Sequence, residues 1–154
     1  MLTINATVII AILLIALFAL ALITGRRFGI LGLGIAAGTL LATQTLVPLE
    51  TIFQLLQEFL GGISPTQAAT ILLLLAPSII LMFANGPKYG SLKGRIFGSL
   101  LYVVMAAFAI LPFVMSLMEI PNEVKNVIMT SHTIALVIGV VVAIIDYISG
   151  SSKK

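Results

Sequence analysis

Cysteine is absent from this chain of 154 residues, and only one histidine and five acidic residues are present. Without cysteine there is no disulfide framework, no thiolate nucleophile and no zinc–thiolate site. The lone histidine and the few acids leave too few groups for acid–base or metal catalysis. We therefore expect a protein that is not an enzyme and that holds no cofactor or metal.

Charge is also scarce, because 8% of the residues are charged and 60% are hydrophobic. A soluble domain of this length has about a quarter charged residues. The composition therefore predicts one integral membrane domain over residues 1–154, with the lipid bilayer as its main surroundings. The net charge of +3 is spread in ones, twos and threes between apolar runs, so nucleic acid is not an expected partner.

Five apolar stretches approach the roughly 20 residues that a helix needs to cross a bilayer. They cover residues 4–24, 28–47, 66–85, 96–118 and 133–148. The sequence thus predicts an all-α, polytopic transmembrane helical bundle with five spans. The first stretch has no basic residues before it and exceeds the apolar core of a signal peptide, so we interpret it as a retained helix.

Basic residues alternate between the links that join these stretches. If all five helices span, one side of the membrane receives seven of the eight basic residues. They are Arg26, Arg27, Lys88, Lys93, Arg95, Lys153 and Lys154. The positive-inside rule makes that side cytoplasmic, with the N-terminus outside and the C-terminus inside a plasma membrane. The first five serve as predicted cytoplasmic anchors, and Tyr89, Tyr102 and Tyr147 are expected at the same interface.

Two outer segments are longer than tight turns. In residues 49–60 the apolar side chains share one helical face, which predicts a short amphipathic helix lying on the outer leaflet. A re-entrant element and a partner-docking helix are the alternatives. The second outer segment begins at Pro121, a residue suited to a first helical turn, and has a weaker apolar stripe.

A pentapeptide recurs as GRRFG at residues 25–29 and as GRIFG at residues 94–98. Each copy stands before a helix that runs outward, and Glu50 and Glu119 follow the two copies at the same offset. Either an ancient duplication explains the pattern, or the two sites independently use the same residues to anchor a helix at the lipid headgroups.

Small residues recur every four positions in two of the predicted helices, where they allow close backbone packing. They are Gly34, Gly38 and Ala42 in one helix and Ala135, Gly139 and Ala143 in the other. We expect these faces to pack inside the bundle, with contacts between copies of the chain or with a protein partner as the alternative.

Polar residues and prolines inside apolar stretches are the remaining candidates. Pro77 and Pro112 each remove a backbone hydrogen bond and are expected to kink their helices. Gln44 needs an interhelical hydrogen bond, or else lines a polar path. Asp146 lies within about one turn of the cytoplasmic end of its helix, where we expect it to reach the interface, and His132 lies at the outer boundary.

The runs GRRFGILGLGIAAGTLLA and KGRIFGSLL, with an apolar first helix and an outer amphipathic segment, resemble the colicin V production protein family over residues 5–118. The acidic residue often found at the start of the family's first helix is Asn5 here, and a fifth helix is extra. The resemblance implies a bacterial inner-membrane protein linked to envelope function or export, and it transfers no catalytic residue.

The sequence therefore favours a non-enzymatic scaffold or accessory component of an envelope or export system. A small oligomeric transporter or channel is the alternative. The lack of a carboxylate near the middle of any predicted span argues against a proton-coupled exporter.

Overall fold

A computed structural model describes residues 6–42, 64–116 and 122–151, and these residues form helices without a β-strand. The helices are α1 (Ala6–Thr24), α2 (Phe28–Ala42), α4 (Pro65–Phe83), α5 (Leu92–Ser116) and α6 (Asn122–Ser151). The predicted all-α class is confirmed. The amphipathic segment 49–60, Gln44 and the last five residues of the predicted second span lie outside the described residues.

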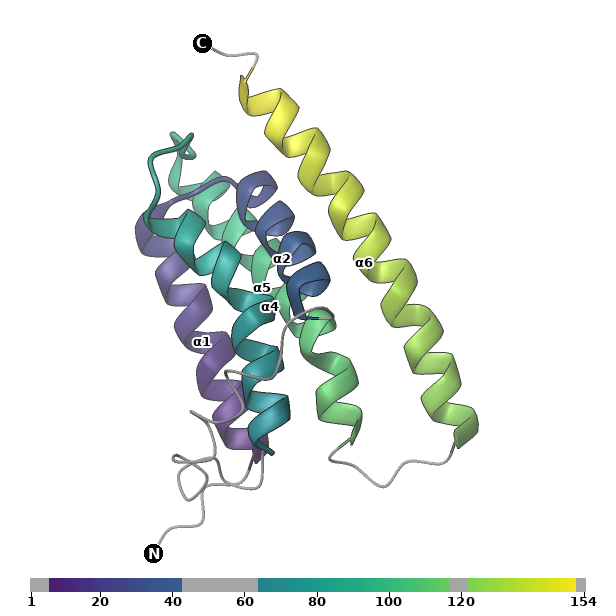
Figure 1. Ribbon diagram of the computed structural model, residues 1–154. Coiled ribbons are helices and arrows are strands. Elements are labelled where there is room, and N and C mark those ends of the chain that lie inside the picture. The colour runs from purple at the N-terminus through teal and green to yellow at the C-terminus, as the bar shows by residue number, and fades with distance from the viewer. Residues whose placement is uncertain (1–5, 43–63, 117–121, 152–154) are drawn as a thin grey trace, which may run out of the picture.

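The helices run up and down side by side (Figure 1). The α1–α2 turn, the α4–α5 loop and the last turn of α6 lie at one end, which we call the basic end. Helix α2 packs against α4, α5 and α6, while α1 packs against α5 and α4. Buried side chains of α1, α2, α4 and α5 form one core, which includes Leu17, Leu31, Leu75 and Ile110.

Three helices are long and apolar enough to cross a membrane, namely Pro65–Phe83, Leu92–Met115 and Asn122–Gly150. Val8–Thr24 and Phe28–Ala42 are apolar but shorter over the described residues. An α-helix rises 1.5 Å per residue, so the 15 residues of α2 extend about 22 Å, short of a bilayer core of ~30 Å.

Two helices begin earlier than the sequence predicts. Helix α5 starts at Leu92 rather than at residue 96, and α6 starts at Asn122 rather than at residue 133. In α6 the hydroxyls of Thr130, Ser131 and Thr133 donate to carbonyls four residues earlier, which lets polar residues continue the helix. The second outer segment is therefore part of α6 from Asn122 onward, and His132 lies within this helix.

The two pentapeptides take different structures. Gly25 follows α1 with a φ of 61°, a left-handed conformation that favours glycine, whereas Gly94 lies in the first turn of α5. The GRRFG copy is thus a turn followed by the start of α2, whereas the GRIFG copy lies wholly within α5, so the two copies differ in structure.

Proline falls inside two helices without ending either of them. Helix α4 continues through Pro77, and α5 continues through Pro112. The start of α4 is well defined, because Ser64 and Gln67 form a reciprocal capping box around Pro65 at the first helical position.

Glycines of α2 bring it close to α4. A Cβ atom at Gly34 would lie 2.7 Å from the Cα of Ser78, and one at Gly38 would overlap the carbonyl oxygen of Leu74. Ala42, the third member of this predicted ridge, is also buried. The structure therefore places Gly34 and Gly38 at a helix–helix contact inside the bundle, where backbones meet without intervening side chains.

Candidate functional site

The α1–α2 turn and the α4–α5 loop are joined by backbone hydrogen bonds at the basic end. Arg26 and Lys88 form an isolated antiparallel β-bridge. The amide of Tyr89 donates to the carbonyl of Gly25 at 2.9 Å, and the amide of Arg27 donates to that of Pro87 at 3.4 Å. These bonds fix two loops side by side and carry the charged side chains described next.

Arg26 closes the end of α4. Its side chain is 6% exposed, and its Nε donates to the carbonyl of Met82 at 3.1 Å. Its two other guanidinium nitrogens donate to the carbonyls of Ala84 and Gly86. The last carbonyls of a helix lack partners within the helix and carry its negative dipole end, so a guanidinium is a suitable cap. The predicted headgroup anchor at Arg26 is therefore corrected, because this side chain is occupied inside the protein.

Asp146 of α6 reaches the start of α2. Its Oδ1 lies 3.0 Å from Nη2 of Arg27, and its Oδ2 accepts a hydrogen bond of 2.8 Å from the amide of Gly29. A carboxylate at a helix N-terminus binds an unpaired amide and favours the positive end of the dipole. The predicted interfacial roles of Asp146 and Arg27 are corrected to a contact between α6 and α2, in which both side chains are more than four-fifths buried.

Tyr89 completes this cluster from the α4–α5 loop. Its hydroxyl accepts a hydrogen bond from the amide of Phe28 at 3.2 Å, and the guanidinium of Arg27 lies 5.3 Å from the centre of its ring. Burial raises the pKa of the Tyr89 phenol, the Phe28 amide partly offsets this rise, and the charge of Asp146 adds to it. Tyr89 therefore takes part in these contacts as a neutral phenol. We call Arg27, Tyr89, Asp146 and the amides of Phe28 and Gly29 the Asp146 cluster.

The other predicted anchors divide into two groups. Lys88 and Lys93 are exposed at the basic end, as the sequence predicts for residues that face an aqueous or headgroup region. Arg95 is half-buried, and its Nε donates to the carbonyl of Tyr89 at 3.4 Å beside Gly25. Among the described residues of the basic end, two lysines are exposed, whereas three arginines bond to other parts of the chain.

The two other tyrosines differ in position. Tyr102 is fully buried, and its hydroxyl lies 2.9 Å from that of Ser78, which itself bonds to the carbonyl of Leu75. The expectation that Tyr102 lies at the membrane interface is wrong, because its position inside α5 turns it toward α4. Tyr147 is exposed near the end of α6.

Helix α6 meets α2 through a second set of small residues. A Cβ atom at Gly29 would lie 2.6 Å from the backbone nitrogen of Tyr147, and one at Gly32 would lie 2.8 Å from the Cβ of Ala143. Ala143 is fully buried. Of the other predicted residues, Gly139 faces Met105 of α5 and Ala135 is half-buried. Gly29 and Gly32 are three residues apart in the sequence. The search for small residues every four positions indicated the face of α2 with Gly34 and Gly38, and it missed this second face.

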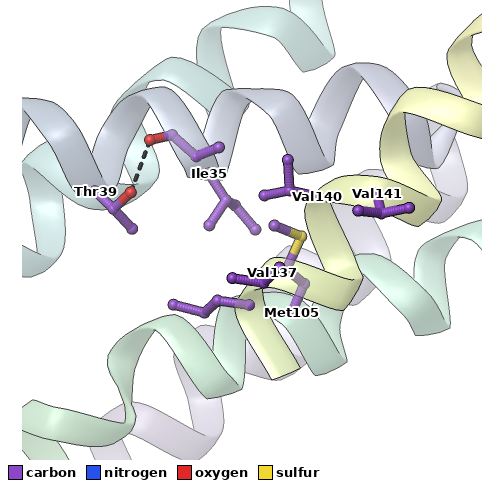
Figure 2. A pocket seen from close by; sticks show the side chains of 8 residues that line it. Ile35, Thr39, Met105, Val137, Val140 and Val141 are labelled. Atoms are coloured by element: carbon purple, nitrogen blue, oxygen red, sulfur yellow. Dashed lines mark hydrogen bonds between the residues drawn. The ribbon is translucent and has the colours of Figure 1, made fainter. Parts of the chain in front are cut away.

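Beyond this contact, an open cleft of about 250 Å³ separates α6 from α2 and α5 (Figure 2). Its lining is formed by Ile35, Ala36, Thr39, Met105, Leu136, Val137, Val140 and Val141. The one hydroxyl, on Thr39, donates to the carbonyl of Ala36 at 2.7 Å. The cleft therefore offers an apolar surface and no ionisable side chain.

Metal ligands do not gather in the described ranges, where no three His, Cys, Asp or Glu side chains are placed to hold an ion. Comparisons with protein-family models, with curated proteins and with solved structures found no match. Three features of the described residues remain as candidates for a function. They are the Asp146 cluster, the apolar cleft and the outer surface of α6.

Proposed function

We propose that the chain is a multi-pass membrane protein with five spans, its N-terminus outside and its basic end in the cytoplasm. Three long apolar helices support membrane insertion. The 19 residues of α1 would extend about 28 Å, close to the thickness of a bilayer core. The exposed Lys88 and Lys93 lie at the end that the positive-inside rule assigns to the cytoplasm.

Within that membrane the chain acts by binding other helices, as a scaffold or accessory component of an envelope or export system. One observation carries this proposal, namely that Ala143 is the one buried residue among the described side chains of α6. The large apolar side chains that this helix exposes are Val124, Val127, Ile134, Val137, Ile138, Val141, Val142, Ile144, Ile145, Tyr147 and Ile148. A surface of this kind suits lipid and the packing of a partner helix.

The resemblance to the colicin V production protein family supports the same class of function and a bacterial inner membrane. The resemblance rests on residues 25–42 and 93–101. In the first of these runs Arg26 and Arg27 bond within the protein, so they are not simple anchors to lipid headgroups. The proposal therefore depends on the α6 surface more than on the resemblance.

A small oligomeric transporter or channel is the second candidate, and the cleft beside α6 is the feature that favours it. Its apolar lining suits an apolar substrate, because an ion or a polar solute would find no partner to replace its water. The scaffold proposal takes precedence because most of the large apolar side chains that α6 exposes lie outside the lining of the cleft.

Affinity purification in mild detergent followed by mass spectrometry tests the choice. A tagged chain should bring down a partner at a stoichiometric level, and alanine at Ile134, Ile138 and Ile145 of α6 should release it. Alanine at Ile12 and Ile15, which are exposed on α1, is the matched control and should keep it. Recovery of the chain alone as a homo-oligomer would instead favour the transporter or channel.

A further inference from the structure

Helix α6 is attached to the bundle unevenly along its length. Near its carboxyl end the backbones of α6 and α2 meet at Gly29, and Asp146 binds both Arg27 and the Gly29 amide. Toward its amino end α6 extends away from α5 (Figure 1). No residue from Asn122 to Val142 is buried. One end of α6 is thus fixed by polar and backbone contacts, and the rest lies beside the bundle.

The cleft lies where α6 leaves α2. Ile35 and Thr39 on α2 face Val137 and Val140 on α6 across it, and Met105 of α5 forms its floor (Figure 2). Moving the amino-terminal part of α6 toward or away from α2 would change this space while breaking few contacts.

We propose that α6 is a hinged arm and that the Asp146 cluster is the latch that sets its angle. The hinge lies at Gly29, Gly32 and Ala143, where two backbones touch without long side chains between them. The latch acts at the same end, because Asp146 ties α6 to the first turn of α2 and Arg27 continues the contact to the ring of Tyr89. When the latch is intact, α6 keeps one angle; when the carboxylate is lost, α6 takes several angles and the cleft varies in width.

Charge and hydrogen bonding contribute separately to the latch. The carboxylate pairs with the largely buried guanidinium of Arg27 and also caps the amide of Gly29. Asp146→Asn keeps an oxygen for the amide and removes the charge, whereas Asp146→Ala removes both. The order of effects should therefore be alanine largest, asparagine intermediate and wild type smallest. This inference goes beyond the proposed function, since α6 can move whether its outer surface binds a partner or lipid alone.

Pulsed electron–electron distance measurement on the full chain in lipid nanodiscs tests the arm. The chain has no cysteine, so spin labels at Leu72→Cys on α4 and Ile134→Cys on α6 report on this pair alone, and both positions are exposed. The latched chain should give one narrow distribution. Asp146→Ala should broaden it, because α6 then takes several angles. Glu123→Gln, an exposed carboxylate changed to an amide on the same helix, is the matched control and should leave it unchanged.

A second pair of spin labels shows whether the substitution disturbs the whole protein or α6 alone. Labels at Ile23→Cys on α1 and Ile80→Cys on α4 report on the four-helix part that the arm leans against. This distance should stay the same in Asp146→Ala. An unchanged α4–α6 distance distribution in Asp146→Ala, or a broadening of both pairs together, would overturn the latch.

Discussion

The carboxylate of Asp146 lies 3.0 Å from the guanidinium of Arg27, although the two residues are 119 positions apart in the chain. Through this pair the last turns of α6 are joined to the turn before α2, and through the ring of Tyr89 to the α4–α5 loop. Three segments that the sequence assigns to one side of the membrane are therefore joined by side-chain contacts, which add to the backbone bonds between the two loops.

The buried Arg26 should be important for stability. Arg26→Ala would leave the carbonyls of Met82, Ala84 and Gly86 without their donor. Hydrogen bonds from charged groups contribute 1.5–3 kcal/mol, so we expect a loss of about 3 kcal/mol in the free energy of unfolding. Chemical unfolding in detergent measures it. Lys88→Ala removes an exposed charge from the same end as the control, and equal stability of the two variants would contradict the capping role.

The contact of α2 with α4 should not tolerate any side chain at Gly38. A Cβ atom there would overlap the carbonyl oxygen of Leu74, so Gly38→Ala should cost about 1–3 kcal/mol and Gly38→Leu more. Gly90→Ala is the matched control, because nothing lies within 4 Å of its Cβ position. Leu40→Ala, at an exposed position of α2, should also melt close to wild type in detergent. If Gly38→Leu melted like Leu40→Ala, the two helices would not be packed at Gly38.

A buried hydroxyl pair joins α4 to α5. Ser78 donates to the carbonyl of Leu75, so Tyr102 is the donor of the 2.9 Å bond between the two side chains. Tyr102→Phe should therefore destabilise the protein by about 1 kcal/mol. A double-mutant cycle with Ser78→Ala isolates the interaction, and Tyr147→Phe at an exposed site serves as the control. Additive effects of the two substitutions would show that the hydroxyls do not interact.

Alkaline pH should weaken the structure at Tyr89. The folded protein raises the pKa of this phenol above its usual value of 10.0, chiefly by burial. Because the pKa is higher in the folded state, folding favours the neutral phenol. The stability that Tyr89 contributes is therefore fully present below the pKa of the unfolded state, and it is lost as the pH rises through the pKa of the folded state. Melting temperatures on both sides of pH 10.0 should fall more steeply for wild type than for Tyr89→Phe. If the melting temperatures of wild type and Tyr89→Phe fell in parallel with pH, the Tyr89 phenol would not contribute to stability in this way.

Hydropathy was sufficient to predict the helical class and the order of the described helices, because an apolar run of this length has few other stable forms in a bilayer. The small-residue spacing likewise indicated Gly34 and Gly38, whose contacts lie within one pair of helices. The length of α6 was not predicted, because the polar residues near Thr130 and Ser131 suggested a boundary, whereas their hydroxyls bond to the helix itself.

The side-chain contacts of the basic end could not be predicted from the sequence. A rule based on charge placed Arg26, Arg27 and Asp146 on one side, but whether an arginine faces lipid or a helix end depends on how distant segments pack. Arg26 meets carbonyls more than 50 residues away, and no spacing in the chain records that contact. The GRRFG run gave a weak signal, because Gly25 marks a turn and Gly29 a close approach.

Labelling of single cysteines in intact cells tests the central claim, which is that these helices span a membrane with the basic end inside. Lys88 in the α4–α5 loop and Asn126 near the start of α6 are both exposed, and these two elements lie at opposite ends of the bundle (Figure 1). The native chain contributes no cysteine. A membrane-impermeant maleimide should label Asn126→Cys in intact cells and Lys88→Cys only after the membrane is permeabilised. Labelling of Lys88→Cys in intact cells, with or without that of Asn126→Cys, would contradict the account.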